Sequence, residues 1–433
     1  MPDIEMLHLT VTDAPADDLA PALTDLSPEQ VVALLRDGKT VANARVKRLK
    51  FRGAVAYPVR FKNCTLVHCE FDGATFQDEV SFAACLLDRA VCQHGTVFEK
   101  ALDLSHSVLN KPTFARMTVK GQFLAAYAEF RGKVAVVDCT FEQRASFWEA
   151  KFSTWIDIKG CVFHGEADFR SAHVEQGFVL SHSTFHGDFL FRGAHVEKKF
   201  QADGSRFEKA LDLSKAKLHD FVYLETIEQG PAQTFAFLNA LAKRIRVRPE
   251  QVEGRLSSER AGKFDDAMQE YGLLKKCYQE LHRFDHEDWA FYRFKVAQRK
   301  SQPVTWAKPW TVWRTLADYL FLDVGCGYGT NPARAVRMAL VIILGFAILY
   351  GARVEMFYTE KLPFPDADPD AKTFLANRVM IGLTTSVSVF TSGMGGIREI
   401  AQGWMNVPVM IESIMGTLLF GLFIVAFSRK VIR

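Results

Sequence analysis

A repeat in which every eleventh position is bulky and apolar runs through the first half of the chain and restricts the folds open to it. These positions are Phe130, Phe141, Phe152, Phe163, Val174, Phe185, Val196, Phe207 and Leu218. A small residue lies two positions before each, and a second apolar series follows six positions after the first. Neither a helix, with a period of about 3.6, nor a flat strand, with a period of about two, buries such a pattern. A solenoid does, because each coil buries the apolar face of its neighbour.

The same pattern extends toward the N-terminus, with a shift in phase near Val119–Phe130. The bulky residues there are Phe61, Leu66, Phe71, Phe76, Phe82, Leu87, Phe98, Leu104, Leu109 and Phe114. This stretch resembles the pentapeptide-repeat family, whose right-handed β-helix has a Leu or Phe at the centre of each face and a small residue two positions before it. The resemblance implies a β-solenoid over 41–224, with roughly eight coils of about 22 residues stacked about 4.8 Å apart.

The charge of the chain is nearly balanced, with 53 Lys and Arg against 50 Asp and Glu. This balance predicts no basic surface for nucleic acid, so we expect no nucleic-acid partner. Residues 1–30 contain seven acids and no Lys or Arg, and we expect residues 1–40 to be acidic and partly disordered. The first residues lack a basic stretch followed by an apolar one, which predicts a cytoplasmic first domain without a signal peptide.

The cysteines and histidines do not predict a metal site. The eight cysteines include no Cys-x-x-Cys pair, and those of the repeat read as small inward residues in a reducing compartment. The histidines fall at outward or turn positions without the fixed spacing of metal ligands: His164, His173, His182, His186 and His195. We therefore expect no cofactor and no resident metal.

Residues 225–334 are expected to form a helical connector, because the repeat stops after Leu218 and Gly230-Pro231 marks the change. One amphipathic helix is predicted by Phe264, Ala267, Tyr271, Leu274, Tyr278 and Leu281. Asp285 can cap a second helix, which completes a hairpin. A segment at the membrane interface, or else a connector core, is predicted by Trp306, Lys308, Trp310, Trp313 and Arg314.

One glycine-rich run, Asp323-Val-Gly-Cys-Gly-Tyr-Gly329, resembles the first nucleotide-binding motif of methyltransferases. That fold needs more than about 100 further residues of alternating strands and helices. Pro332 and an apolar segment follow here instead. We therefore expect these glycines to form the bend into a membrane helix.

The region 335–433 contains two long apolar segments, expected to span a membrane over about 335–358 and about 408–430. Between them, a short helix over about 375–390 leads into a filter-like run at 391–396, which reads Thr-Ser-Gly-Met-Gly-Gly. Glycines let successive carbonyls point the same way, and such backbone persists at membrane depth only where it lines a water-filled path. A third full crossing would put the basic C-terminus outside, which the charge rule disfavours.

These segments resemble the outer helix, re-entrant loop and inner helix of the two-transmembrane potassium channel superfamily. The family filter reads Thr-Val-Gly-Tyr-Gly-Asp, so the resemblance implies carbonyl donors at Thr391, Ser392, Gly393, Met394 and Gly395. Met394 stands in place of the Tyr, and Gly396 stands in place of the Asp. We expect these two differences to affect selectivity for potassium more than conduction.

Two further sets of residues have expected roles in the pore. Gly416 and Gly421 lie on the inner helix, where a bend can open a gate. The loop before the short helix contains acids that either concentrate cations at the outer mouth or belong to a plain hydrophilic loop: Asp366, Asp368 and Asp370.

The predicted function is a cation channel, with potassium as the leading ion. One chain has too few helices to enclose a filter, so we expect a homotetramer in the plasma (inner) membrane with both termini cytoplasmic. The solenoid would regulate opening or recruit a cytoplasmic protein partner. The alternative is a membrane-anchored scaffold that does not conduct. We find no nucleophile–base pair or paired carboxylates, so we expect no enzyme.

Overall fold

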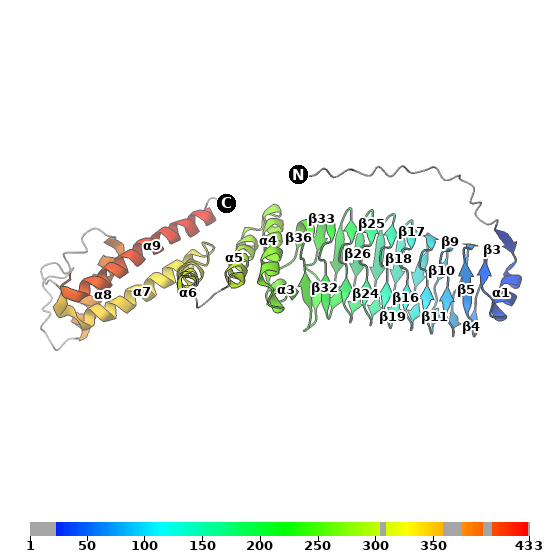
Figure 1. Cartoon of the computed structure of the whole chain (residues 1–433), viewed down its shortest axis with the longest axis horizontal. Helices are drawn as coiled ribbons and strands as arrows, with labels where there is room; N and C mark the ends of the chain where they lie inside the picture. The colour runs from blue at the N-terminus through cyan, green and yellow to red at the C-terminus, as the bar shows by residue number, and fades with distance from the viewer. Residues whose placement is uncertain (1–22, 304–308, 358–374, 393–400, 432–433) are drawn as a thin grey trace, which may run out of the picture. The chain divides into compact units, whose positions relative to one another are not determined.

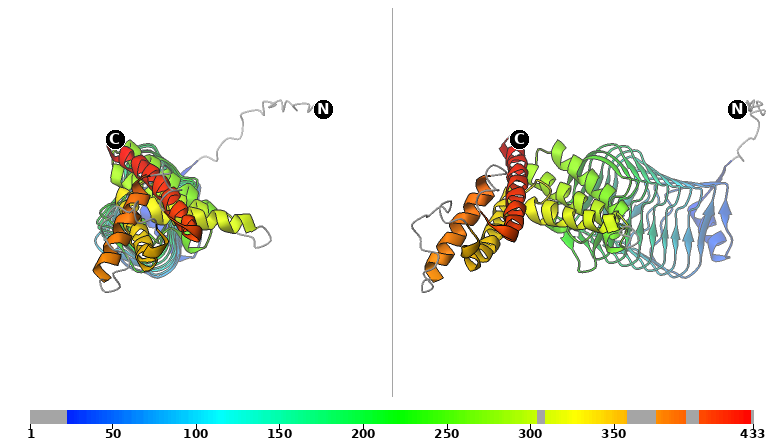
Figure 2. Two further views of the ribbon diagram at one scale, coloured as in Figure 1. Left: turned by 90° about the vertical axis from the view of Figure 1, so that its left-hand side faces the viewer. Right: turned by 60° about the vertical axis from the view of Figure 1, so that its left-hand side comes forward.

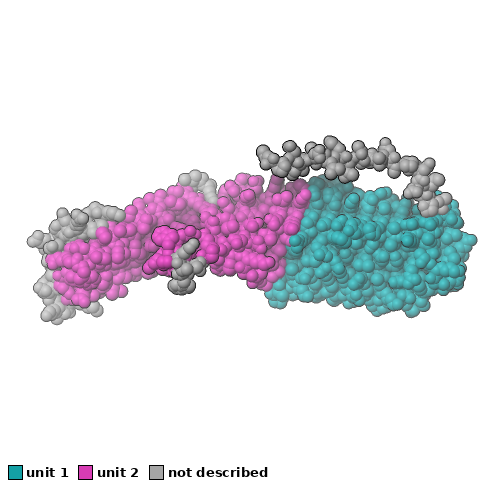
Figure 3. Space-filling model, viewed as in Figure 1, with its two compact units in different colours: residues 1–212, 226–233 teal, residues 213–225, 234–433 magenta. Residues whose placement is uncertain are grey.

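The computed structural model describes residues 23–303, 309–357, 375–392 and 401–431. They form two compact units, shown in two colours in Figure 3. The first unit comprises Met1–Asp212 and Thr226–Gln233, and the second comprises Leu213–Glu225 and Thr234–Arg433. The first is a parallel β-solenoid, and the second is mostly helical (Figure 1).

Short parallel strands make up the first unit, wound into a solenoid of about 10 coils (Figures 1 and 2). One sheet contains β1 (Thr24–Leu26), β3 (Ala44–Lys47), β6 (Thr65–Val67), β9 (Leu86–Asp88), β10 (Val91–Cys92), β13 (Val108–Asn110), β14 (Thr113–Ala115), β17 (Glu129–Arg131), β18 (Val134–Val137), β21 (Lys151–Phe152), β22 (Ile156–Lys159), β25 (His173–Val174), β26 (Phe178–Ser181), β29 (His195–Val196) and β30 (Phe200–Asp203). A second contains β4 (Gly53–Val55), β7 (Ala74–Phe76), β11 (Val97–Phe98), β15 (Thr118–Val119), β19 (Thr140–Phe141), β23 (Val162–Phe163), β27 (Thr184–Phe185), β31 (Arg206–Phe207) and β34 (Glu228–Gln229). A third contains β2 (Val41–Ala42), β5 (Val59–Lys62), β8 (Val80–Ser81), β12 (Leu102–Asp103), β16 (Phe123–Leu124), β20 (Ala145–Ser146), β24 (Ala167–Asp168), β28 (Phe189–Leu190) and β32 (Ala210–Asp212).

The register between neighbouring strands sets the length of each coil. Phe141 pairs with Phe163, and Phe163 pairs in turn with Phe185, so the later coils are equal in length. The earlier coils vary in length. Val41 pairs with Phe61, and fewer residues separate this pair than separate Phe141 from Phe163. The phase shift predicted near Val119–Phe130 falls where the coil length becomes constant.

Stacked phenylalanine rings fill the core of the solenoid. The ring of Phe163 lies 4.7 Å from that of Phe141 and 4.8 Å from that of Phe185, and all three side chains are buried. The small residues two positions earlier are buried as well, and the Cys161 amide donates a hydrogen bond of 3.1 Å to Ser183 Oγ. The predicted inward assignment of bulky and small residues is therefore confirmed in these coils.

A short helix, α1 (Pro28–Arg36), packs against the first coil. Ser27 and Gln30 form a capping box at the start of this helix, and its own residues Val31 and Leu35 are buried. Residues expected to be partly disordered thus include an ordered cap from Leu23 onward, whereas residues 1–22 lie outside the described part. A capping helix of this kind covers apolar surface that a terminal coil would leave exposed.

The second unit begins with strands. β33 (Lys217–Tyr223) pairs in parallel with β36 (Leu241–Arg246), with Lys217 opposite Leu241 and an irregularity between Leu218 and Phe221. The strand β35 (Thr234–Ala236) lies between them in sequence. Strands therefore extend past the expected boundary at 224, because this longer coil loses the five-and-six spacing but still buries its apolar residues.

Four helices follow the strands: α2 (Pro249–Val252), α3 (Ser257–Arg260), α4 (Phe264–Glu280) and α5 (Phe284–Ser301). The helices α4 and α5 pack against each other as the predicted hairpin. Ala267, Tyr271, Leu274 and Tyr278, which were predicted on one helical face, are buried in α4.

The helices described in the rest of the second unit are α6 (Pro309–Ala317), a π-helix η1 (Asp318–Val324), α7 (Pro332–Ala352), a 3-10 turn η2 (Val354–Met356), α8 (Leu375–Ser392), a 3-10 turn η5 (Gly403–Met405) and α9 (Asn406–Val431). By length and composition, α7 and the helical segment Gly403–Val431 could cross a membrane. The segment Arg378–Thr391 of α8 is shorter. A full crossing takes roughly 20 apolar residues, and the apolar segment Arg378–Thr391 falls short of that length.

We predict that Phe163→Ala destabilises the solenoid by about 3–5 kcal/mol, because the cavity lies between two stacked rings. The measurement is urea unfolding of the full chain in detergent, followed by far-ultraviolet circular dichroism. The neighbouring exposed His164, changed to Ala, is the control and should cost less than about 1 kcal/mol. Equal losses for the two variants would contradict the inward placement of Phe163.

Candidate functional site

The short helix α8 packs against both long helices, α7 and α9 (Figures 1 and 2). Glycines allow this close approach: a Cβ placed on Gly382 of α8 would lie 2.3 Å from the Ala347 carbonyl oxygen of α7. A Cβ on Gly416 of α9 would lie 2.3 Å from the Phe390 carbonyl oxygen of α8. Small residues of this kind let helix backbones pack tightly within a membrane.

The predicted filter begins at the C-terminal end of α8. Thr391 and Ser392 belong to the last turn of this helix, so the helix continues past the expected end near 390. The Thr391 hydroxyl donates to the Val387 carbonyl oxygen at 2.8 Å, the usual contact with the preceding turn. The other filter and mouth residues lie outside the described part of the chain: Gly393, Met394, Gly395, Asp366, Asp368 and Asp370.

The two glycines predicted as a gate have different surroundings. Gly416 is in close contact with α8, as its distance to Phe390 shows. A Cβ on Gly421 would meet no atom within 4 Å. Gly416 is thus a packing residue in this conformation, and of the two only Gly421 has room for a side chain. The hinge role of either residue stays a prediction.

A buried carboxyl group lies at the contact of the three helices. Glu412 of α9 is 0% exposed, and its Oε1 is hydrogen-bonded to Ser386 Oγ of α8. The same Ser386 Oγ lies 2.9 Å from the Ile343 carbonyl oxygen of α7. The buried Tyr350 hydroxyl of α7 faces the Glu412 carboxyl, without a hydrogen bond of standard geometry to Glu412 Oε2.

The sequence prediction overlooked Glu412, because it treated the inner helix as apolar throughout. One signal was present, since Glu412 is the single charged residue between Asn406 and Phe427. A charge within a membrane helix is costly and marks a functional position by default. The polar face of α8 also gave no signal, because Ser386 lies among several Ser and Thr residues.

The second half of the glycine-rich run, 327–329, forms a turn shortly before α7, whereas Asp323 and Val324 end the π-helix η1. Gly327, Tyr328 and Gly329 have positive φ values of 57°, 53° and 77°, and the Asn331 side chain caps α7. A left-handed turn of this kind suits glycine, which has no Cβ to clash.

Asp323 at the start of this run is part of an ion-pair cluster. Its carboxylate lies 2.7 Å from Arg299 of α5 and 3.6 Å from Arg334 of α7, and it accepts a hydrogen bond of 2.8 Å from Tyr292. Burial lowers the pKa of Arg299, but its hydrogen bond to Asp323 and the nearby Tyr328 outweigh this effect and raise the pKa overall. Asp323 thus joins α5 to α7.

The C-terminal end of α9 is also joined to α5. Arg429 Nε lies 3.0 Å from Asp288 Oδ1, and its Nη2 lies 3.8 Å from Glu287 Oε1. The Arg429 guanidinium also stacks on Phe291 at 4.3 Å. Glu287 and Asp288 are only 4% and 8% exposed, so this ion pair is shielded from water. The following Lys430 reaches only Asp285, at 3.8 Å, on the exposed surface.

Exposed apolar residues cover the outer faces of the long helices. On α7 these include Leu340, Val341, Leu344 and Ile348, and on α9 Leu418, Phe420, Val425 and Phe427. In α6, Trp310 and Trp313 are 75% and 67% exposed, whereas Trp306 and Lys308 lie outside the described part. Lipid or further subunits would cover surfaces of this size.

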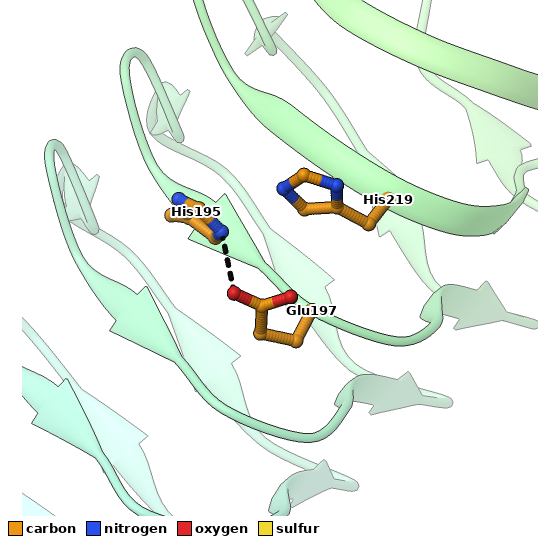
Figure 4. Close-up of side chains that lie close together, drawn as sticks. All are labelled: His195, Glu197 and His219. Atoms are coloured by element: carbon orange, nitrogen blue, oxygen red, sulfur yellow. Dashed lines mark hydrogen bonds and ion pairs between the residues drawn. The ribbon is translucent and has the colours of Figure 1, made fainter.

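The histidines of the solenoid follow the coil register. The ring of His173 lies against that of His195, its strand partner one coil later, with ring centroids 4.9 Å apart and the planes tilted by 60°. His195 also makes a hydrogen bond of 2.9 Å to Glu197 (Figure 4). His219, also drawn there, belongs to β33 of the second unit. The rows of histidine thus follow from the register of the repeat.

Comparison with protein-family models, with curated proteins and with solved structures gives no match to this chain. The function is therefore inferred from the residues and contacts described above, together with the two sequence resemblances.

We predict that Gly416→Ala disrupts the helix bundle whereas Gly421→Ala is tolerated. The first variant forces α9 away from the Phe390 carbonyl oxygen, at an expected cost of about 1–3 kcal/mol. The second adds a methyl group in open space. The measurement is the melting temperature of the purified protein in detergent. A larger loss at Gly421 than at Gly416 would contradict the packing role.

Proposed function

We propose that the chain is a subunit of a homotetrameric cation channel in the plasma (inner) membrane, with potassium as the leading permeant ion. One observation carries the proposal. The short apolar helix α8 is held between two helices long enough to span a membrane, and it ends where the run Gly393-Met394-Gly395 begins. A short helix that enters the membrane, followed by glycine-rich backbone, is the arrangement in which carbonyl oxygens replace the water around a cation.

The end of α8 suits a cation. The last four carbonyls of a helix lack partners within the helix and carry a partial negative charge. Thr391 and Ser392 lie in that last turn, and the glycines follow at once. The negative end of α8 is therefore joined directly to the proposed filter.

Basic residues support a topology with both termini in the cytoplasm. Arg334 and Arg337 lie in the first turns of α7, and Arg429 and Lys430 lie in the last turn of α9. Basic ends of spanning helices favour the cytoplasmic side. The solenoid and the connector then share the cytoplasmic side, and the loop with Asp366 faces out. Because one chain supplies one such loop, four chains are needed around the axis.

A membrane-anchored scaffold is the second candidate, and one observation favours it. His106, Tyr127 and Trp148 form an outward row on successive coils, with ring centroids 4.9 Å and 5.0 Å apart. Tyr127 and Trp148 are 41% and 39% exposed. Exposed aromatic residues are enriched where proteins bind one another. The row therefore suits a cytoplasmic protein partner, with or without conduction.

We predict that the purified wild type conducts potassium in liposomes, and that Gly393→Val and Gly395→Val abolish the flux. A branched side chain disfavours the backbone conformations open to glycine and narrows a carbonyl-lined path. The control is Gly345→Ala in α7, where a Cβ meets no atom within 4 Å. If wild type carries no flux, or if the filter variants conduct normally, the scaffold is favoured instead.

We predict that Arg429→Gln changes the open probability of single channels by about tenfold or more, without altering ion selectivity. The variant removes a shielded ion pair between α9 and α5, and breaking one such partner costs about 3–5 kcal/mol. Lys430→Gln is the matched control, since its partner Asp285 is exposed and its ion pair contributes little. The measurement is single-channel recording in planar bilayers. Equal effects of the two variants would contradict a coupling role for Arg429.

A further inference from the structure

The two hydrogen-bond contacts of the Ser386 hydroxyl indicate the protonation state of Glu412. Ser386 Oγ lies within hydrogen-bond distance of two oxygens, the Ile343 carbonyl and Glu412 Oε1. A carbonyl oxygen and an ionised carboxylate only accept hydrogen bonds, and a serine hydroxyl has one proton to donate. The two contacts therefore need a second proton, and a protonated Glu412 carboxyl supplies it.

The surroundings of Glu412 agree with a neutral carboxyl. The groups facing it are Tyr350 of α7 and Ser386 of α8, and both are uncharged. Among the described residues, no basic side chain forms an ion pair with it. An isolated ionised carboxylate is very costly to bury, whereas a protonated one that is hydrogen-bonded is tolerated.

We propose that Glu412 is a positioning residue for the filter: a protonated carboxyl that ties α8 to both spanning helices. Glu412 donates to Ser386, and Ser386 donates to the Ile343 carbonyl, so three helices are linked through one hydroxyl. Ser386 lies less than two helical turns before Ser392, where α8 ends. These hydrogen bonds thus fix where the C-terminal end of α8 lies along α7 and α9, and the proposed filter begins at that end. This inference rests on the proposed channel function.

The position of Glu412 predicts how its variants differ. Glu412→Gln keeps both an acceptor and a donor for Ser386, so it should retain the selectivity of the wild type. Glu412→Met keeps the volume but makes no such hydrogen bond, and it should reduce the potassium-to-sodium permeability ratio by about tenfold. Ser386→Ala should reduce the ratio similarly. The control is Ser388→Ala, on the same helix at a partly exposed position.

The pH dependence distinguishes a protonated Glu412 that donates a hydrogen bond to Ser386 from a Glu412 side chain that only fills space. Ionisation of Glu412 removes the donor, so the wild type should lose selectivity as the pH is raised from about 6 to about 9. Glu412→Gln has no proton to lose and should keep a constant permeability ratio over that range.

The experiment measures reversal potentials of the purified full chain in planar bilayers, with potassium on one side and sodium on the other. Loss of selectivity in Glu412→Met and Ser386→Ala, with retention in Glu412→Gln, supports the proposal. If Glu412→Gln is as damaged as Glu412→Met, or if Glu412→Met and Ser386→Ala resemble Ser388→Ala, the proposal is overturned while the channel function stands. If the wild type carries no current, the channel function fails, and this inference falls with it.

Discussion

Close backbone contact between helices is the constraint on which the C-terminal bundle depends. Lipid chains are as apolar as leucine, so helices in a membrane gain little from burying apolar side chains against each other. Tight packing and hydrogen bonds must hold them together instead. Gly382 and Gly416 supply the packing, because their backbones lie against carbonyls of the facing helices. Ser386 and Glu412 supply hydrogen bonds at the same contact. The packing at the two glycines and the hydrogen bonds of Ser386 together determine where α8 lies.

The helix α5 contacts both spanning helices at their cytoplasmic ends in the proposed topology. Arg299 of α5 pairs with Asp323, just before α7, and Asp288 of α5 pairs with Arg429, at the end of α9. A displacement of α5 therefore acts on the start of one spanning helix and the end of the other. Two shielded ion pairs resist such a displacement more than exposed pairs do. This pair of contacts gives the connector a physical means of influencing the proposed pore.

The solenoid could be predicted in detail because its repeat is a strong and redundant signal. A constant period, kept over many coils, places Phe141, Phe163 and Phe185 inside without any knowledge of their contacts. The boundary near 224 was less predictable, since the coil of β33 and β36 is longer and departs from the period. Composition alone also hid α1, because an acidic N-terminal stretch masked the capping signal of Ser27 and Gln30.

The long C-terminal helices were predicted from hydropathy, but their contacts were not. Hydropathy averages over a segment, so one acid at position 412 is lost among apolar neighbours. Likewise, Gly416 and Gly421 look alike in sequence, although only Gly416 lies against another helix. The ion pairs of Asp323 and Arg429 join residues far apart in sequence, which no local pattern reveals.

The equal length of the later coils has a consequence for how this chain can change in size. Deleting or duplicating one whole coil, such as the stretch from Phe141 up to its strand partner Phe163, would return every remaining side chain to its own face. The rod would shorten or lengthen by one layer of about 4.8 Å, and the cap at one end would be unaffected. Insertions that do not complete a coil would turn Phe side chains out into water. The solenoid is in this sense a spacer whose length is adjustable in whole layers.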